Sequence, residues 1–166
     1  MTGGAACSGA HFAMDLNTCG SVPTSEGPKA ELLGAKVGAP SRAASGATLH
    51  LTVDVFSVTG RAMTMSTGYA EVLITRDGHV VGKHVGGNAS PGVNPGRIEG
   101  STSGRVPAVV ALLGCPQEPI DLMDPIAARL PLPPGEYELV AVVTDSGIRG
   151  TGSTVLVSAP TTIQIE

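Results

Sequence analysis

Apolar and polar residues alternate most regularly in the segment Thr48–Val58. Leu49, Leu51, Val53 and Val55 are separated by threonine, histidine and aspartate side chains. Successive side chains of a β-strand point to opposite faces, so a period of two with one polar face predicts a half-buried strand. The segment therefore gives the clearest secondary-structure signal of the chain.

Similar signals recur along the chain and predict seven to nine short strands. Besides Thr48–Val58, the expected strands are Lys29–Val37, Tyr69–Thr75, His79–Val85, an edge strand at Arg97–Ser101, Arg105–Leu113, Glu136–Thr144, Thr154–Ser158 and Thr161–Ile165. The triplet Arg76-Asp77-Gly78 lies between two apolar runs, and Asp-Gly in that context favours a tight hairpin turn. Gly60–Gly68 is expected to be a connection, and one helical turn is expected near Ile126–Arg129.

The segment Leu130–Asp145, LPLPPGEYELVAVVTD, indicates the fold class. A proline-rich turn through Pro134 and Gly135 leads to Tyr137 and then to an alternating apolar strand. A tyrosine at the corner before a late strand is typical of immunoglobulin-like sandwiches. We therefore expect an all-β protein, an immunoglobulin-like antiparallel β-sandwich with an extended N-terminal tail.

Composition agrees with short strands and excludes several partners. Charged residues are 14% of the 166 positions, and the chain holds 23 glycines and 13 prolines, which favours strands and turns over helices. A net charge of −4 with three lysines leaves no basic surface for nucleic acid. No apolar run is long enough to span a membrane. Two Phe, two Tyr and no Trp provide no aromatic platform for stacking on bases.

Residues 1–28 are expected to form an extended tail or linker, followed by a single domain at residues 29–166. The tail has neither the basic nor the apolar region of an intact secretory signal. The chain has three cysteines, Cys7, Cys19 and Cys115. A Cys19–Cys115 disulfide would attach the tail to the domain and imply an oxidising compartment. A Cys7–Cys19 bridge and three unpaired thiols remain the alternatives, and the position of Cys7 after Gly-Ala-Ala suggests a lipid anchor or a free thiol.

Together, Thr48–Val58, the Asp-Gly hairpin, Cys115 and the closing LPPGEYELVAVVTD resemble the immunoglobulin-like or fibronectin-III-like domains of secreted actinobacterial envelope proteins and lipoproteins. The resemblance covers roughly Cys19–Glu166. It implies an exported sandwich that acts as a binding or structural module, with no catalytic residue. The Cys…Trp…Cys pattern of true immunoglobulin domains is absent, because the chain has no Trp.

Histidine and methionine are the remaining candidates for metal chemistry, since copper prefers imidazole and thioether ligands. They are His11, His50, His79, His84, Met14, Met63 and Met65. Exposed histidines and space-filling methionines are the favoured interpretation. The stretch Gly100–Gly104 has Thr102 at its centre, so it does not match the G-x-S-x-G pattern of a serine hydrolase.

The sequence thus predicts a non-catalytic, exported cell-envelope protein that is a structural or protein-binding module. No catalytic residue, metal site or cofactor is predicted, and the expected partner is another protein or the chain itself. One alternative is a self-assembling subunit of an extracellular filament or surface layer. The other is an exported copper-handling protein.

Overall fold

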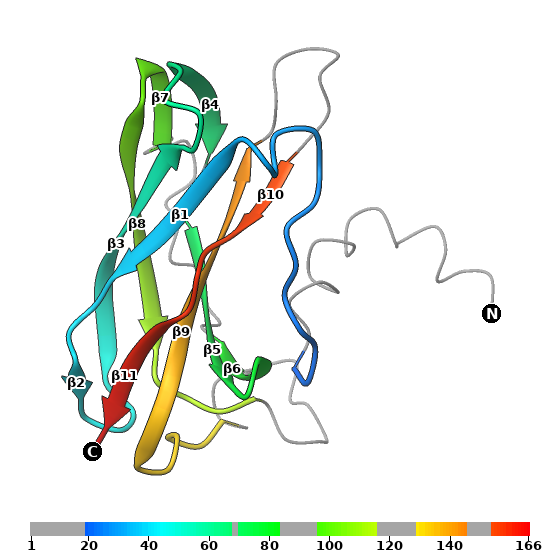
Figure 1. The fold of residues 1–166 in the computed structure, drawn as a ribbon. Helices are drawn as coiled ribbons and strands as arrows, with labels where there is room; N and C mark the ends of the chain where they lie inside the picture. Colours follow the sequence, from blue (N-terminus) through cyan, green and yellow to red (C-terminus); the bar gives the residue numbers. More distant parts are fainter. Residues whose placement is uncertain (1–18, 68–69, 84–95, 116–128, 146–153) are drawn as a thin grey trace, which may run out of the picture.

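A computed structural model describes residues 19–67, 70–83, 96–115, 129–145 and 154–166 (Figure 1). Within these ranges the chain forms strands and no helix, so the prediction of an all-β fold is confirmed. The strands are β1 (Leu33–Gly38), β2 (Arg42–Ala43), β3 (Thr48–Ser57), β4 (Met63–Thr67), β5 (Ala70–Arg76), β6 (His79–Lys83), β7 (Gly96–Ser101), β8 (Ser103–Ala111), β9 (Gly135–Asp145), β10 (Thr154–Val157) and β11 (Thr161–Ile165).

The strands form one hydrogen-bonded sheet in the order β1-β3-β8-β5-β9-β11-β2. β10 pairs with β9, β6 pairs with β5, and β4 pairs with β7 and β9. The sheet curls, so that β1, at one end of the strand order, also lies close to β9 and β10. Its two ends approach each other where the Thr161 hydroxyl donates a hydrogen bond to the carbonyl oxygen of Val37, 3.4 Å away. The result is a curled, half-barrel arrangement around one core.

Two strand pairs are parallel, and the expectation of a purely antiparallel sandwich is wrong at these pairs. β5 runs parallel to β8, and β2 runs parallel to β11. Parallel neighbours are not joined by a tight hairpin, so no turn motif in the sequence marks them. The described residues form eleven strands where seven to nine were expected, partly because the two-residue β2 is too short to show a period.

The strand boundaries follow the sequence prediction with a few exceptions. Gly60–Gly68 was expected to be a connection, but it contains β4, whose Met63 and Met65 point into the core. β1 begins at Leu33, not Lys29, because residues 27–32 form turns in which Ala30 donates to Gly27. The expected helical turn lies largely outside the described residues, and Arg129 is not helical.

The main core lies inside the curl and is built from the apolar positions of alternating strands. In β3, Leu51, Val53 and Val55 are buried while the residues between them are exposed. The facing strands contribute further aliphatic side chains, including Val72, Val106, Leu139 and Ile163. Each fully buried aliphatic side chain of this kind contributes roughly 1.5–3 kcal/mol to stability.

β9 and β5 are buried on both faces over their central residues, which differs from the one-sided burial expected for Glu136–Thr144. Leu139–Val143 are all buried, as are Val72–Thr75. On the outer side, Leu73, Val80 and Val142 form a second cluster, against which Cys19, Cys115, Val155 and Val157 pack. We call residues 19–29, which begin at this cluster with Cys19, the strap.

Tyr137 fastens the turn that precedes β9. Its side chain is 2% exposed, and its hydroxyl donates a 2.8 Å hydrogen bond to the carbonyl oxygen of Pro133. This contact is the geometry of a tyrosine corner. The Arg76 guanidinium lies 4.1 Å from the centroid of the tyrosine ring. Gly135 has a φ of 153°, and a Cβ atom there would lie 2.8 Å from the Arg76 side chain, so glycine suits the position.

We expect Tyr137→Phe to lower the free energy of unfolding by about 1 kcal/mol, because it removes one hydrogen bond and keeps the ring contact with Arg76. The measurement is denaturant unfolding, read as a fall in the transition midpoint at constant slope. An unchanged midpoint would show that the hydroxyl contributes nothing to stability.

Candidate interaction face and strap

A disulfide joins Cys19 to Cys115, which confirms the pairing expected from the sequence. The two Cα atoms are 6.1 Å apart, and 96 positions separate the residues. The backbone N–H of Cys115 donates to the carbonyl oxygen of Val81, which fixes the bridge beside β6. Disulfides persist in oxidising compartments, so the bridge is consistent with an exported protein. Cys7 lies outside the described residues.

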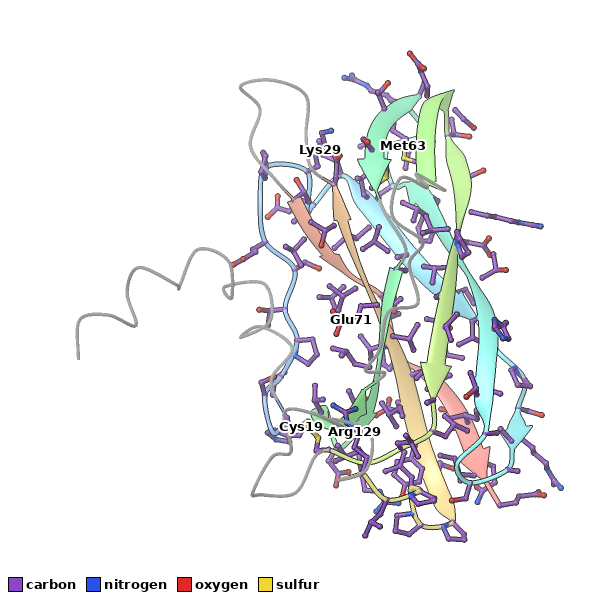
Figure 2. The ribbon with its side chains drawn as sticks, turned by 180° about the vertical axis from the view of Figure 1, so that it is seen from behind. Cys19, Lys29, Met63, Glu71 and Arg129 are labelled. Carbon is purple, nitrogen blue, oxygen red and sulfur yellow. A yellow bond between two sulfur atoms is a disulfide. The ribbon has the colours of Figure 1, made fainter. Side chains whose placement is uncertain are left out.

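The strap runs from this disulfide to Lys29 along the outer side of the sheet (Figure 2). Near its start it exchanges backbone hydrogen bonds with Val80 of β6 through Gly20 and Ser21. Farther along, Glu26 exchanges two backbone hydrogen bonds with Val155 of β10, at 2.8 and 2.9 Å. The strap therefore pairs with two strands, and its Cys19 packs against the outer cluster.

The division into a tail of residues 1–28 and a domain of residues 29–166 stays a prediction. Within the expected tail, residues 19–28 belong to the strap, whereas residues 1–18 lie outside the described part of the chain. No helix in the described ranges is long and apolar enough to cross a membrane.

The far end of the strap is held by an ion pair that the sequence analysis did not identify. The Lys29 ammonium lies 2.7 Å from a carboxylate oxygen of Asp145, whose side chain is 2% exposed. Lys29 also donates to the carbonyl oxygen of Thr64, and the N–H of Ser66 donates to the other oxygen of Asp145. The pair thereby connects the strap with β4 and β9. A lone aspartate ending the apolar run LVAVVTD was the one sequence signal for it.

The candidate copper ligands that lie in the described ranges are not brought together. Met63 and Met65 are 8% and 2% exposed and face the main core. His50 lies on the exposed side of β3, and His79 contacts the strap through Gly20, with its Nδ1 3.1 Å from the carbonyl oxygen. His11, Met14 and His84 lie outside the described residues. In the described ranges, no three His, Cys, Asp or Glu side chains form a potential metal site.

Three exposed apolar side chains, Leu32, Phe56 and Val58, lie next to one another at one end of β1 and β3. We call them the apolar patch. They are 49%, 39% and 61% exposed, respectively. Val58 donates its backbone N–H to Leu32, which places these two residues opposite each other. Among the described residues, the other large exposed hydrophobic side chains are Val22 and Leu130, which lie on other segments.

Phe56 is held against the sheet by the glycine that it faces across the strand pair. Gly34 is the register partner of Phe56. A Cβ atom at Gly34 would overlap the phenyl ring, so the missing side chain makes room for the ring to lie across β1. No sequence motif marks the patch, because Leu32 and Val58 are 26 residues apart and meet only through strand pairing.

Comparisons with known proteins do not assign a family. No protein-family profile matches the chain, and no curated protein matches it. A solved β-glucosidase from Erythrobacter marinus is similar, with a TM-score of 0.38 and 14% identity, over 86% of this chain and 15% of that protein. The chain thus spans a small part of the β-glucosidase, and a likeness at this TM-score carries no argument about fold or function.

We expect the double variant Cys19→Ser/Cys115→Ser to lose roughly 2–5 kcal/mol of stability, because the bridge closes a long loop of the unfolded chain. Both proteins should be made in a Cys7→Ser background, so that no alternative disulfide can form. Denaturant unfolding gives the stability, and hydrogen exchange at the Glu26 and Val155 amides reports on the strap. Full retention of stability and of exchange protection would contradict the assigned role.

We expect Lys29→Met to lower stability by roughly 1–3 kcal/mol, because it leaves the buried Asp145 carboxylate without its cation. The value lies below that of a fully buried pair, since Lys29 is 25% exposed. Adding Asp145→Asn should recover part of the loss, because the amide needs no counter-ion. A double-mutant cycle measures the coupling, and strict additivity of the two changes would rule it out.

Proposed function

We propose that the chain is a non-catalytic module of an exported cell-envelope protein, with an immunoglobulin-like sandwich fold, and that it binds another protein through the apolar patch. The observation that carries the proposal is the clustering of Leu32, Phe56 and Val58. Single exposed hydrophobic side chains are ordinary on protein surfaces, whereas adjacent ones mark interaction sites.

The composition of the patch supports a protein partner. The described residues include two aromatic side chains of Phe or Tyr. Phe56 is exposed, whereas Tyr137 is buried. Aromatic side chains are enriched at the energetic centres of protein interfaces. Polar and charged groups border the patch, with the exposed ion pair of Asp54 and Arg105 next along β3 and β8. An apolar centre with a polar rim is the usual anatomy of such an interface.

The immunoglobulin-like class and the exported location rest on separate observations. The tyrosine corner at Tyr137 and Pro133 supports the fold class. The Cys19–Cys115 disulfide supports an oxidising compartment. A second copy of the chain is an alternative partner, which corresponds to the self-assembling subunit considered in the sequence analysis.

The test is site-specific photo-cross-linking in the cell envelope of the organism that makes the protein. A photoreactive residue at Val58 should yield a discrete cross-linked species, and its mass and peptides should identify one partner. The matched control is the same residue at Thr48, which is exposed on the outer face of β3 at the other end of the strand.

A discrete adduct from Val58 and none from Thr48 would support protein binding at the patch. An adduct with a second copy of the chain would replace the proposal by self-assembly. Equal, heterogeneous cross-linking from both positions, or no adduct from either, would contradict protein binding at the patch.

A further inference from the structure

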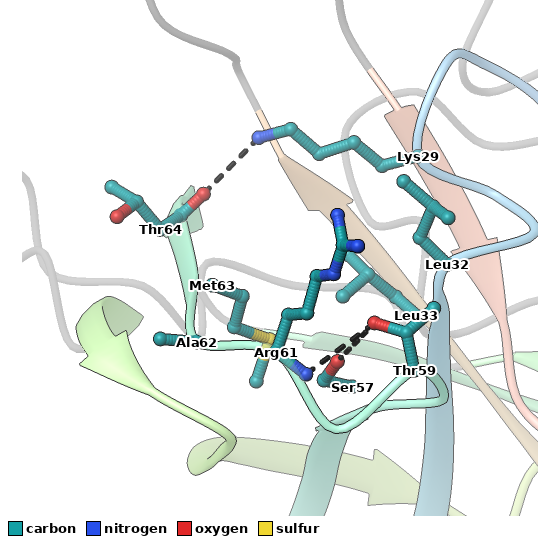
Figure 3. A pocket seen from close by; sticks show the side chains of 9 residues that line it. All are labelled: Lys29, Leu32, Leu33, Ser57, Thr59, Arg61, Ala62, Met63 and Thr64. Carbon is teal, nitrogen blue, oxygen red and sulfur yellow. Dashed lines mark hydrogen bonds between the residues drawn. The ribbon is translucent and has the colours of Figure 1, made fainter.

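A hollow of about 370 Å³ lies beside the apolar patch, between the end of the strap and the connection from β3 to β4 (Figure 3). Its lining residues come from three segments that are distant in sequence: the end of the strap with the start of β1, the end of β3, and the β3–β4 connection with the start of β4. They include Lys29, Leu32, Leu33, Thr59, Arg61 and Met63.

The hollow has an apolar base and a few polar groups. Leu33 and Met63 are 7% and 8% exposed and belong to the main core, so the base rests on rigid structure. The hydroxyls of Ser57 and Thr59 lie 3.2 Å apart and bond to each other. A concave, mostly apolar site with few orienting polar groups is typical of small-ligand sites, and its volume lies near the lower end of their usual range.

The charges of the lining residues favour an anion. They include two cations, Lys29 and Arg61, and no carboxylate. Lys29 is already neutralised by Asp145 at 2.7 Å. Within the described ranges, the Arg61 guanidinium has no carboxylate at salt-bridge distance. Glu31, which precedes the lining residue Leu32 in sequence, lines an adjoining hollow.

We propose that this hollow binds a small amphiphile with one carboxylate and an unbranched apolar body, such as a medium-chain monocarboxylate. The carboxylate binds the Arg61 guanidinium, whose planar pair of donors fits two carboxylate oxygens. The apolar body covers Leu33 and Met63. This inference goes beyond the proposed function, because ligand binding in the hollow requires no protein partner and is tested without one.

The experiment titrates octanoate into the full, disulfide-bonded chain and follows the methionine methyl signals by NMR. The Met63 signal, assigned by its loss in Met63→Leu, should shift in a saturable manner, because Met63 lines the hollow. Octan-1-ol and octylamine are the probes without a negative charge, and both should bind at least tenfold more weakly.

Arg61→Gln should weaken octanoate binding about tenfold, since a charged hydrogen-bonded partner at a partly exposed site contributes about that factor. Arg42→Gln is the matched control. It removes the same charge at an exposed ion pair on β2, at the other end of the molecule, and should leave binding unchanged (Figure 1).

The proposal is overturned if octanoate causes no saturable shift of the Met63 signal, if octan-1-ol binds as well, or if Arg61→Gln binds like the unchanged protein. Thermal unfolding of each variant checks that it is folded. Arg61 is exposed, so its replacement should not alter the fold.

Discussion

The two-sided burial of β5 and β9 is the constraint on which the rest of the structure depends. A strand whose consecutive residues are all apolar must be covered on both faces, because either face would otherwise expose a hydrophobic surface to water. The curled sheet covers the inner face of these strands with the main core. The outer face, with Leu73, Val80 and Val142, needs a separate cover. Cys19 of the strap, Cys115, Val155 and Val157 pack against this cluster, and the strap pairs with β6 and β10.

Different interactions hold the two ends of the strap. At Cys19 a covalent bond limits the freedom of the unfolded chain, which stabilises the folded state independently of salt and pH. At Lys29 an ion pair with a nearly buried carboxylate holds the chain. Such pairs are weak sources of net stability, because desolvation offsets the Coulomb attraction. The pair instead fixes the relative positions of three segments. Asp145 also accepts a hydrogen bond from Ser66, so the strap, β4 and β9 meet at one carboxylate.

Periodicity and turn chemistry made much of the fold predictable. The alternation in β3, the Asp-Gly turn and the corner before β9 all encode local structure, and local structure follows from neighbouring residues. The parallel pair of β5 with β8 and the pairing of the strap with β10 join segments that are far apart in sequence. The run Leu139–Val143 did contain a signal, since apolar residues on both faces imply a second cover.

The candidate surfaces were less predictable than the fold, because they exist only after strands pair. Leu32, Arg61 and Met63 carry no motif, and nothing in their spacing marks a site. The apolar patch and the hollow share Leu32, which is about half exposed and forms part of both. Binding free energies at two sites that share a side chain are linked, and the effect of each ligand on the other is reciprocal. A molecule in the hollow that moves Leu32 therefore changes the surface offered to a protein partner, and a partner that fixes Leu32 changes the affinity of the hollow by the same factor. If both proposals hold, the two sites act as one regulated surface, with Leu32 as the shared contact.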